Sequence, residues 1–535
     1  SNEDEEIIPI STDELLDNKT TERVIPTRII KEISALSPTA TENSGNALRR
    51  NWWKLLMAFI ITIVVITVGI YFLAKRPRSK SDESNNNNSS GNETTNFNYP
   101  PNVTYDSFYI PILPQLDSSF MKIDNSTFDN TKSSLNSPPI NQEYPYGQAG
   151  YPIRGVNLDG WLVLEPLIVP SFFSPDAPDE ASVAKSLGPD AAKTKFIKHY
   201  NEFVNEEDFK KMSEFGLNHV RIQIGFWAIE VLEGESYVPY ASWQFLLRGI
   251  NWARKYGLRV FVDLHKVPDD KGILRKVGNF NDNGLNGLNE SQRTLRHIKA
   301  LANFFNRDNY THVTSLLGPI DETNSKFVVG NLSEFYNRSY QNITASYNDS
   351  SRQPYVVLDE AQAGFSTWWT LLKSLNRAIL GSHSWFIYNK EFSSANSSDY
   401  EKLILSWSCE QKTNFFSNAN ENVKTIATEW AAVVNDCDHM HAIDSSILLP
   451  CSTCKCDSDN DWRNWNQTKK DSLLKLAEVQ MDAYESGSGW FYWTWKTENN
   501  HAPKFDYKLG VENGWIPDLK KNRTSTSFCD SRNAN

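Results

Sequence analysis

The chain has 535 residues, of which 39% are hydrophobic and 12% aromatic, and its formal net charge is −11. This length accommodates a large globular domain together with flanking segments. The acidic balance argues against a nucleic-acid-binding protein, but it leaves a neutral polymer open as a ligand.

Residues 1–54 are polar, acidic at the start and without apolar periodicity, which predicts a disordered cytoplasmic tail. Residues 55–74 form an uninterrupted, uncharged apolar run. A helix needs about 20 such residues to span a bilayer. The run therefore predicts a transmembrane helix, because the core of a signal peptide would be shorter and closer to the N-terminus.

Basic residues flank both ends of this run, so charge does not set its orientation. Asn-x-Ser/Thr acceptors for N-glycosylation crowd the C-terminal side, from Asn88 to Asn522, whereas Asn18 precedes the run. All six cysteines also follow it. Both asymmetries predict a type II membrane protein whose C-terminal part is lumenal or extracellular, in the secretory pathway, the plasma membrane or at the cell surface.

The cysteines are predicted to form disulfides in that oxidising compartment, and they are Cys409, Cys437, Cys451, Cys454, Cys456 and Cys529. We expect Cys409 to pair with Cys437, because both flank a predicted strand. Cys451, Cys454 and Cys456 form a tight cluster that also raises the alternative of zinc. The cluster lacks a second pair at zinc-finger spacing, so we expect no metal and no cofactor.

Residues 75–150 are rich in Asn, Ser, Thr and Pro and predict a glycosylated stalk. Residues 151–535 are aromatic-rich, and short β-type runs alternate there with helical patterns such as Glu207–Phe215 and Tyr240–Tyr256. This alternation predicts parallel βα units. We expect an α/β fold, a (β/α)₈ TIM barrel, with strands at Pro152–Leu158, His219–Gly225, Arg259–His265, His312–Leu317, Tyr355–Glu360, Ser384–Asn389, Thr425–Trp430 and Trp490–Lys496.

The chemistry of such a barrel lies at the C-terminal ends of its strands. Glu429 closes the predicted seventh strand and is a candidate nucleophile of a retaining glycosidase, or else a structural carboxylate paired with a barrel arginine. Arg221, in the second strand, is the candidate that would hold this carboxylate ionised. His265 closes the third strand and His383 precedes the predicted sixth. Such histidines more often complete a local hydrogen-bond network than act on a substrate.

Two tryptophans, Trp493 and Trp495, lie in the predicted eighth strand. An indole ring offers a flat apolar face to a sugar, although a tryptophan in a barrel strand is as often simple packing.

Several segments resemble the fungal exo-β-1,3-glucanases of glycoside hydrolase family five: YPIRGVNLDGWLVLEPLIVPSFF from Tyr151, DFKKMSEFGLNHVRIQIGFWA from Asp208, YGLRVFVDLH from Tyr256, TEWAAVVNDC from Thr428 and WFYWTWKTEN from Trp490. The resemblance implies a (β/α)₈ barrel, a retaining double-displacement mechanism and β-1,3-glucan as substrate. It implies these roles: Glu429 as nucleophile, Arg221 and His383 in the active site, Trp495 as a sugar-stacking face, and Glu165 and His265 as pocket walls.

The chain also departs from this family. The Asn-Glu-Pro that supplies the catalytic acid is matched to Leu317-Gly318-Pro319, a His-Asp-Ala-Phe stretch becomes Leu358-Asp359-Glu360-Ala361, a tyrosine becomes Trp385, and the loop at 266–271 is rewritten. We therefore expect a glucanase-like domain that acts on or binds cell-wall β-1,3-glucan with impaired hydrolysis, a pseudoenzyme in the limiting case.

The alternative is an active exo-β-1,3-glucanase in which Glu360, Asp321 or Glu322 substitutes for the lost acid. Glu360 is favoured, because it ends a strand next to the fourth. A third hypothesis is a scaffold that binds no glucan.

Overall fold

The computed structural model describes residues 129–268, 287–321, 329–385, 400–418, 423–433, 461–521 and 528–529. The predicted tail, the apolar run 55–74, most of the predicted stalk, Glu322 and four of the cysteines lie outside these ranges. Among the helices in the described ranges, none is both long and apolar enough to cross a membrane.

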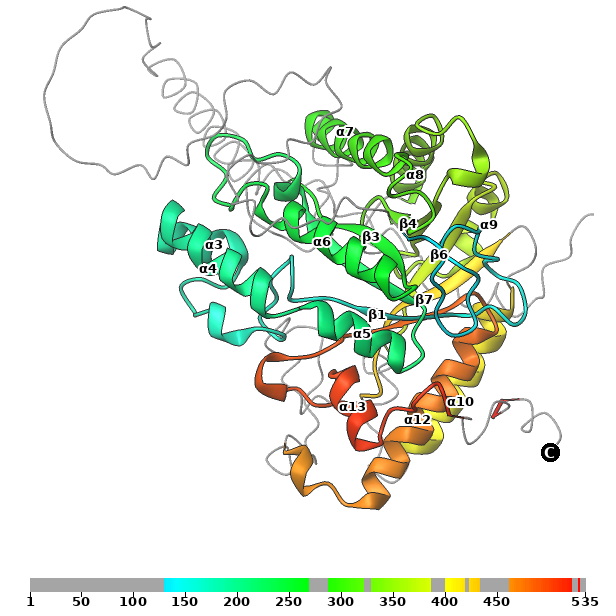
Figure 1. The fold of residues 1–535 in the computed structure, drawn as a ribbon. Coiled ribbons are helices and arrows are strands. Elements are labelled where there is room, and N and C mark those ends of the chain that lie inside the picture. Colours follow the sequence, from blue (N-terminus) through cyan, green and yellow to red (C-terminus); the bar gives the residue numbers. More distant parts are fainter. Residues whose placement is uncertain are drawn as a thin grey trace, which may run out of the picture. The chain divides into compact units, whose positions relative to one another are not determined.

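Eight parallel strands close into a barrel in sequence order, so the predicted (β/α)₈ fold is confirmed (Figure 1). Each strand pairs with the next, and β8 closes on β1 with Gly489 opposite Ile153. The strands are β1 (Ile153–Asn157), β2 (His219–Gly225), β3 (Arg259–Lys266), β4 (Thr314–Gly318), β5 (Tyr355–Asp359), β6 (Ala378–His383), β7 (Lys424–Trp430) and β8 (Gly489–Tyr492).

The helices that connect and cover these strands are α3 (Glu180–Leu187), α4 (Pro189–Glu202), α5 (Glu206–Glu214), α6 (Ala241–Lys255), α7 (Gly287–Phe305), α8 (Val329–Thr344), α9 (Phe365–Lys373), α10 (Tyr400–Asn414), α12 (Gln467–Glu485) and α13 (Tyr507–Asn513). Figure 1 shows α10 and α12 side by side against the last strands. Every residue of β2 is buried, since one face of the strand lines the barrel and the other meets helices.

Local sequence signals set where several helices begin and end. Asn205 and Asp208 form a reciprocal capping box at the start of α5, as Asp179 and Ser182 do at the start of α3. Gly514 ends α13 at φ 86°, in the left-handed region that glycine adopts at little cost. The capping residues in the sequence thus lie within a residue or two of the ends of these helices.

The predicted sixth strand is wrong. Ser384–Asn389 was expected, but β6 is Ala378–His383, and the chain turns directly after it, where the Trp385 amide donates to the His383 carbonyl (2.9 Å). Ile379 and Leu380, whose side chains point to opposite sides of β6, are fully buried. His383 ends its strand, at the same level as Glu429 of β7.

Residues 129–150, which we call the strap, pack across the N-terminal ends of the strands. The Arg259 guanidinium, at the start of β3, donates to Ser137 Oγ and to the carbonyl oxygens of Pro138, Pro139 and Gln142 over 2.7–3.1 Å. Ile140 and Tyr144 are buried. The predicted stalk boundary at residue 150 is therefore too late, and the folded domain includes residues from about 129.

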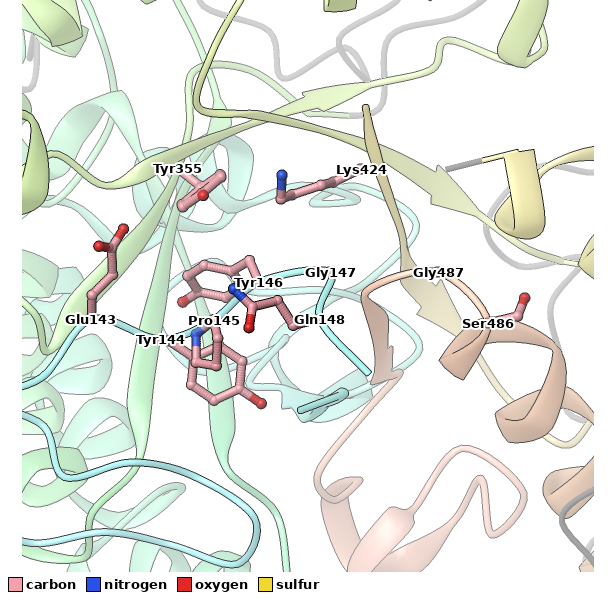
Figure 2. A pocket seen from close by; sticks show the side chains of 10 residues that line it. All are labelled: Glu143, Tyr144, Pro145, Tyr146, Gly147, Gln148, Tyr355, Lys424, Ser486 and Gly487. Carbon is pink, nitrogen blue, oxygen red and sulfur yellow. The ribbon is translucent and has the colours of Figure 1, made fainter. Parts of the chain in front are cut away.

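The strap also lines a cavity of about 720 Å³, drawn in Figure 2. Its walls include Tyr146 and Gln148 of the strap together with Tyr355 and Lys424, the first residues of β5 and β7. The cavity thus lies at the end of the barrel opposite to Glu429, and its size does not mark the candidate catalytic site.

A disulfide joins Cys409 of α10 to Cys529, with their Cα atoms 5.2 Å apart. The expected pairing of Cys409 with Cys437 is therefore wrong. The pairing with Cys437 was expected because both cysteines flank β7 in the sequence. Cys409 lies in α10, however, and bonds to Cys529, 120 residues later in the chain.

Candidate active site

Arg221 is the centre of the charged cluster at the C-terminal ends of the strands. Its side chain is fully buried, and Nη1 lies 2.7 Å from Glu429 Oε1. Nη2 lies 2.7 Å from Asp263 Oδ2 and 2.6 Å from Asp321 Oδ2. One guanidinium therefore bridges carboxylates from three neighbouring parts of the barrel, which fixes their relative positions.

Two histidines complete the cluster. His265 Nδ1 lies 2.8 Å from Asp321 Oδ2, and His383 Nε2 lies 3.1 Å from Asp321 Oδ1. The other ring nitrogen of His383 lies 3.4 Å from Glu429 Oε2. Burial opposes protonation of His383, but the charges of Glu429 and Asp321 outweigh it and raise the pKa of His383 well above its usual value.

The two carboxylates that flank His383 differ in acidity. Burial raises the pKa of Glu429 to about 7; His383 and Arg221 oppose this rise, and the charge of Asp321 adds to it. Asp321 is buried too, but Arg221 and His383 outweigh its desolvation and hold its pKa well below the usual range. Asp321 is therefore an ionised partner of the cations, and not a proton donor at neutral pH.

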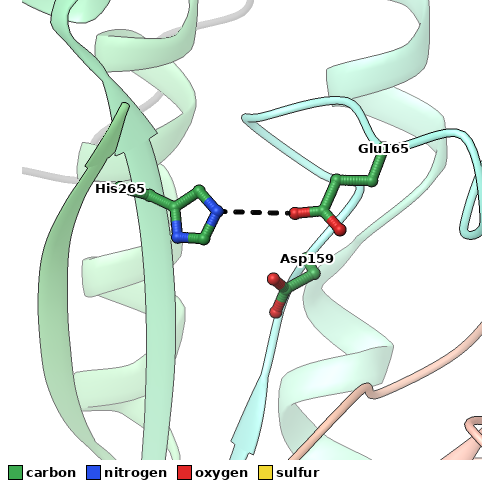
Figure 3. Close-up of side chains that lie close together, drawn as sticks. All are labelled: Asp159, Glu165 and His265. Atoms are coloured by element: carbon green, nitrogen blue, oxygen red, sulfur yellow. Dashed lines mark ion pairs between the residues drawn. The ribbon is translucent and has the colours of Figure 1, made fainter. Parts of the chain in front are cut away.

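Three side chains beside this cluster, where β1 and β3 end, are shown in Figure 3. His265 Nε2 lies 3.7 Å from Glu165 Oε1, and one oxygen or nitrogen atom from each of Asp159, Glu165 and His265 lies within 4.8 Å of the others. Gln223 Nε2 donates to Asp159 Oδ2 (2.5 Å). Burial, and then the charge of Glu165, raises the pKa of Asp159 to about 7.

The two tryptophans have separate environments. Trp493 follows β8 and lies near Asp159, whose pKa it lowers through a hydrogen bond, and its ring contacts Trp385 edge-on (centroids 5.7 Å apart). Trp495 is 1% exposed, and its indole donates to Asp208 Oδ1 of α5 (3.0 Å). The predicted sugar-stacking role of Trp495 is therefore wrong, because its ring is packed between the barrel and α5.

Glu360 follows β5 and has mainly local partners. Its carboxylate accepts from Ser382 Oγ (3.1 Å) and from the Gly364 amide (3.0 Å), and its carbonyl accepts from the Trp368 indole (2.8 Å). Burial raises its pKa, so the carboxyl holds its proton better than usual. These contacts are typical of a group that stabilises the turn after β5.

The end of β4 carries the segment Leu317-Gly318-Pro319, which is matched to the family's acid motif. Gly318 is the last residue of the strand, and a Cβ at this position would lie 2.1 Å from Asp263 Oδ1. The Asp263 carboxylate would have to move to admit any side chain at this position. The side chain at this end of the barrel that reaches the charged cluster is Asp321, three residues later.

The structure therefore unites Glu429, Arg221, His265, His383 and Glu165, as predicted from strand ends and resemblance, and leaves Trp495 out. Sequence reasoning missed Asp263 and Asp159. Alternation along a strand could have found them, because Asp263 is two residues before His265 and Asp159 is two residues after the buried Asn157 of β1.

In sequence, the chain is similar to curated proteins named "Probable glucan 1,3-beta-glucosidase D". It is 32% identical over 433 residues to the one from Aspergillus terreus, covering 75% of this chain and 50% of that protein. The one from Aspergillus flavus is 34% identical over 427 residues, covering 74% and 50%. The chain thus spans about half the length of these relatives, and no family model matches it.

In structure, the chain is similar to the rutinosidase from Aspergillus niger, with a TM-score of 0.52 at 14% identity, covering 69% of this chain and 98% of that one. This likeness supports the barrel fold alone. Over three quarters of its length the chain is therefore similar in sequence to proteins named glucan 1,3-beta-glucosidase D, and it folds as a closed eight-stranded parallel barrel.

Proposed function

We propose that this chain is a glucanase-like member of glycoside hydrolase family five, and that it cleaves β-1,3-glucan by a retaining mechanism with Glu429 as the nucleophile. The cluster of Glu429, Arg221, His383 and Asp321 carries the proposal. The names of the relatives support the substrate class.

Glu429 is suited to attack because its two oxygens have different partners. Oε1 lies against Arg221 and Oε2 against His383, so the carboxylate is held in one orientation. A retaining glycosidase forms a covalent glycosyl-enzyme through such a carboxylate, while a second carboxyl group protonates the leaving oxygen and then activates water.

We assign the acid/base role to Glu322. Asp321 lies in the cluster, in contact with Arg221 and both histidines. If Asp321 stands where the family has the asparagine of Asn-Glu-Pro, the glutamate of that motif corresponds to the next residue, Glu322. Glu322 lies outside the described residues, so this assignment rests on its place in the sequence.

Kinetics on two substrates test these roles. We expect Glu429→Gln to lose turnover of both laminarin and a dinitrophenyl β-glucoside. Glu322→Gln should lose laminarin turnover by about 10²–10⁴ and the activated glucoside by much less, because a good leaving group departs without protonation. Azide, which needs no base, should restore cleavage of the glucoside by Glu322→Gln.

Glu360→Gln is the control and should retain most of the wild-type laminarin turnover. If Glu360→Gln instead showed the selective loss and the azide rescue, the acid would be Glu360. If Asp321→Asn alone showed them, the acid would be Asp321.

One observation favours the impaired, glucan-binding alternative that the sequence suggests. Asp321 adds a negative charge beside Glu429, which contributes to raising the pKa of Glu429 to about 7. A protonated Glu429 cannot attack an anomeric carbon. Saturable laminarin binding by the wild type without detectable turnover of either substrate, measured from pH 5 to pH 8.5, would establish this alternative and contradict hydrolysis.

We further propose that residues 55–74 anchor the domain as a type II membrane protein, with the barrel on the lumenal or extracellular side. The acceptor asparagines after the run support this orientation. The disulfide between Cys409 and Cys529 is consistent with an oxidising compartment. Protease treatment of sealed microsomes should leave the barrel intact and glycosylated; a digested, unglycosylated barrel would contradict the orientation.

A further inference from the structure

Asn-x-Ser/Thr acceptors occur within the folded domain as well as before it, and their side chains differ in accessibility. A glycan is attached to the amide nitrogen of the asparagine, Nδ2. An oligosaccharide is bulky and hydrated, so it fits where this nitrogen faces solvent and not where it faces a packed helix. The environment of the amide group therefore distinguishes acceptors that share one sequence motif.

Asn309 and Asn348 lie on exposed turns that lead into β4 and β5. Arg352 joins the two turns, because its Nη2 donates to Asp308 Oδ1 (2.6 Å) and to the Asn306 carbonyl (2.8 Å). The turns lie at the N-terminal ends of the strands, where the strap packs, and the candidate active site lies at the opposite ends. A glycan on either asparagine would therefore leave that site uncovered.

Asn466 is exposed and is the N-cap of α12. Its Oδ1 accepts from the Lys469 amide (2.9 Å), so the cap uses the oxygen of the side chain and not its nitrogen. A glycosylated asparagine keeps this oxygen, and the cap therefore remains after a glycan is attached. Gln467 and Thr468, which complete the acceptor motif, are exposed too.

Asn342 has the same motif in the opposite environment. It is a half-buried residue of α8, and its Nδ2 donates to the Leu295 carbonyl of α7 (3.3 Å). The next residue, Ile343, is fully buried. A glycan on this nitrogen would begin between two helices that pack against each other and would have to separate them. Asn337, half-buried in the middle of α8, lies between the two cases and is not part of the proposal.

We propose that Asn309, Asn348 and Asn466 each carry an N-linked glycan and that Asn342 does not. The co-reactant is an oligosaccharide linked to a polyprenyl diphosphate. The asparagine nitrogen forms a bond to C1 of the first sugar and gives up one proton, while the bond from C1 to the diphosphate breaks and the diphosphate leaves with the electron pair. The inference rests on the proposed lumenal or extracellular orientation of the barrel, because secreted domains are the ones that receive such glycans.

Peptide mass spectrometry tests the proposal on the detergent-solubilised full chain from a eukaryotic host, in the fraction whose barrel resists limited proteolysis. Peptide N-glycosidase F in heavy-oxygen water converts each glycosylated asparagine into a labelled aspartate, so the label marks the acceptors that were occupied. We expect the label at Asn309, Asn348 and Asn466, and none at Asn342.

Thr468→Ala and Asn342→Gln are the matched variants. Thr468→Ala removes the acceptor motif but keeps the Asn466 cap, so the chain should lose the mass of one glycan at unchanged thermal stability. Asn342→Gln should leave the glycan mass unchanged. Label at Asn342 in the folded chain, or no label at one of the three proposed acceptors in a chain labelled elsewhere, would overturn the inference and leave the orientation intact. A chain without label at any acceptor would contradict the orientation and the inference together.

Discussion

At the residue scale, Asp321 determines the electrostatics of the candidate site. It contacts the cations Arg221, His265 and His383. One of its carboxylate oxygens also lies within 4.8 Å of a carboxylate oxygen of Glu429. The glucanases that the chain resembles have a neutral asparagine in their Asn-Glu-Pro motif, and we propose that Asp321 stands in its place. A charged group at this position stabilises the protonated histidines and makes ionisation of Glu429 more difficult.

We predict that Asp321→Asn moves the acidic limb of the kcat/KM profile to lower pH, by about one pH unit. Removing the negative charge lowers the pKa of Glu429, so the carboxylate is present at lower pH. The measurement is the pH dependence of dinitrophenyl β-glucoside cleavage. Asp308→Asn, at an exposed carboxylate, is the control. An acidic limb that stays in place or moves to higher pH would contradict the role of Asp321.

The residues of the site could be predicted only in part. Glu429 and His265 are predictable because they lie near strand ends, and Arg221 because it lies within β2, all three in motifs that the resemblance covers. Trp495 was misassigned because sequence does not show which face of a strand end turns outward, and Asp208 of α5 captures its indole. Leu317-Gly318-Pro319 and Asp321-Glu322 offer two matches to the family's acid motif, and sequence alone does not choose between them.

At the element scale, Arg259 is one of the residues that fix the strap to the barrel. We predict that Arg259→Met destabilises the domain by about 2–4 kcal/mol, because the carbonyl groups of Pro138, Pro139 and Gln142 lose their buried donor. Limited proteolysis should then cut within residues 129–150. Lys210→Met, at an exposed ion pair on α5, is the control and should change stability by less than about 1 kcal/mol. A strap that stays protected in Arg259→Met would show that other contacts fix it.

The disulfide gives a second prediction at this scale. Replacing Cys409 and Cys529 by serine should lower the free energy of unfolding by about 2–5 kcal/mol, because the unfolded chain loses a closed loop. Peptide mapping of the unreduced protein should recover a Cys409–Cys529 linkage. Recovery of a Cys409–Cys437 peptide in its place would contradict this pairing.

At this scale the sequence predicts that a strand exists more reliably than it predicts which residues form that strand. β2 coincides with its predicted range, since its buried residues are bounded by Asn218 and by the turn after Gly225. β6 was displaced by its own length, because Trp385 and the apolar residues after it carry the same β-type signal as Ile379 and Leu380. The strap was missed because its sequence resembles the polar segment before it, although its aromatic residues are buried.

At the scale of the whole molecule, several buried carboxyl groups favour their protonated form in the folded state. Burial is the first cause in each case, and it raises the pKa of Glu180 to about 8 and those of Asp159 and Glu429 to about 7. The pKa of His265 is raised to about 10, because its hydrogen bonds to Asp263 and Asp321 outweigh its burial. All four groups bind protons more tightly when folded.

We therefore predict that stability falls as pH rises from 6.5 to 8.5. A group whose folded pKa is raised stabilises fully below its unfolded pKa, and this contribution is lost as pH rises through the folded value. Glu180 alone should account for roughly 2 kcal/mol over this range. Urea unfolding at both pH values measures the effect, and Glu180→Gln should have a flatter dependence. A wild type that gains stability over this range would contradict the prediction.

The barrel as a whole was predictable because alternating βα patterns admit few closed arrangements. Membrane topology and glucan specificity remain proposals that rest on the apolar run at 55–74 and on the similarity to relatives.

The central claim is that Glu429 is a nucleophile that becomes covalently bound to the sugar. Incubation with an activated 2-deoxy-2-fluoro-β-glucoside slows release of the sugar and traps such an intermediate. Mass spectrometry of the digested protein should find one fluoroglucosyl group on the peptide that contains Glu429, and none in Glu429→Gln. Labelling of another carboxylate, or no labelling of the folded wild type from pH 5 to pH 8.5, would contradict the account.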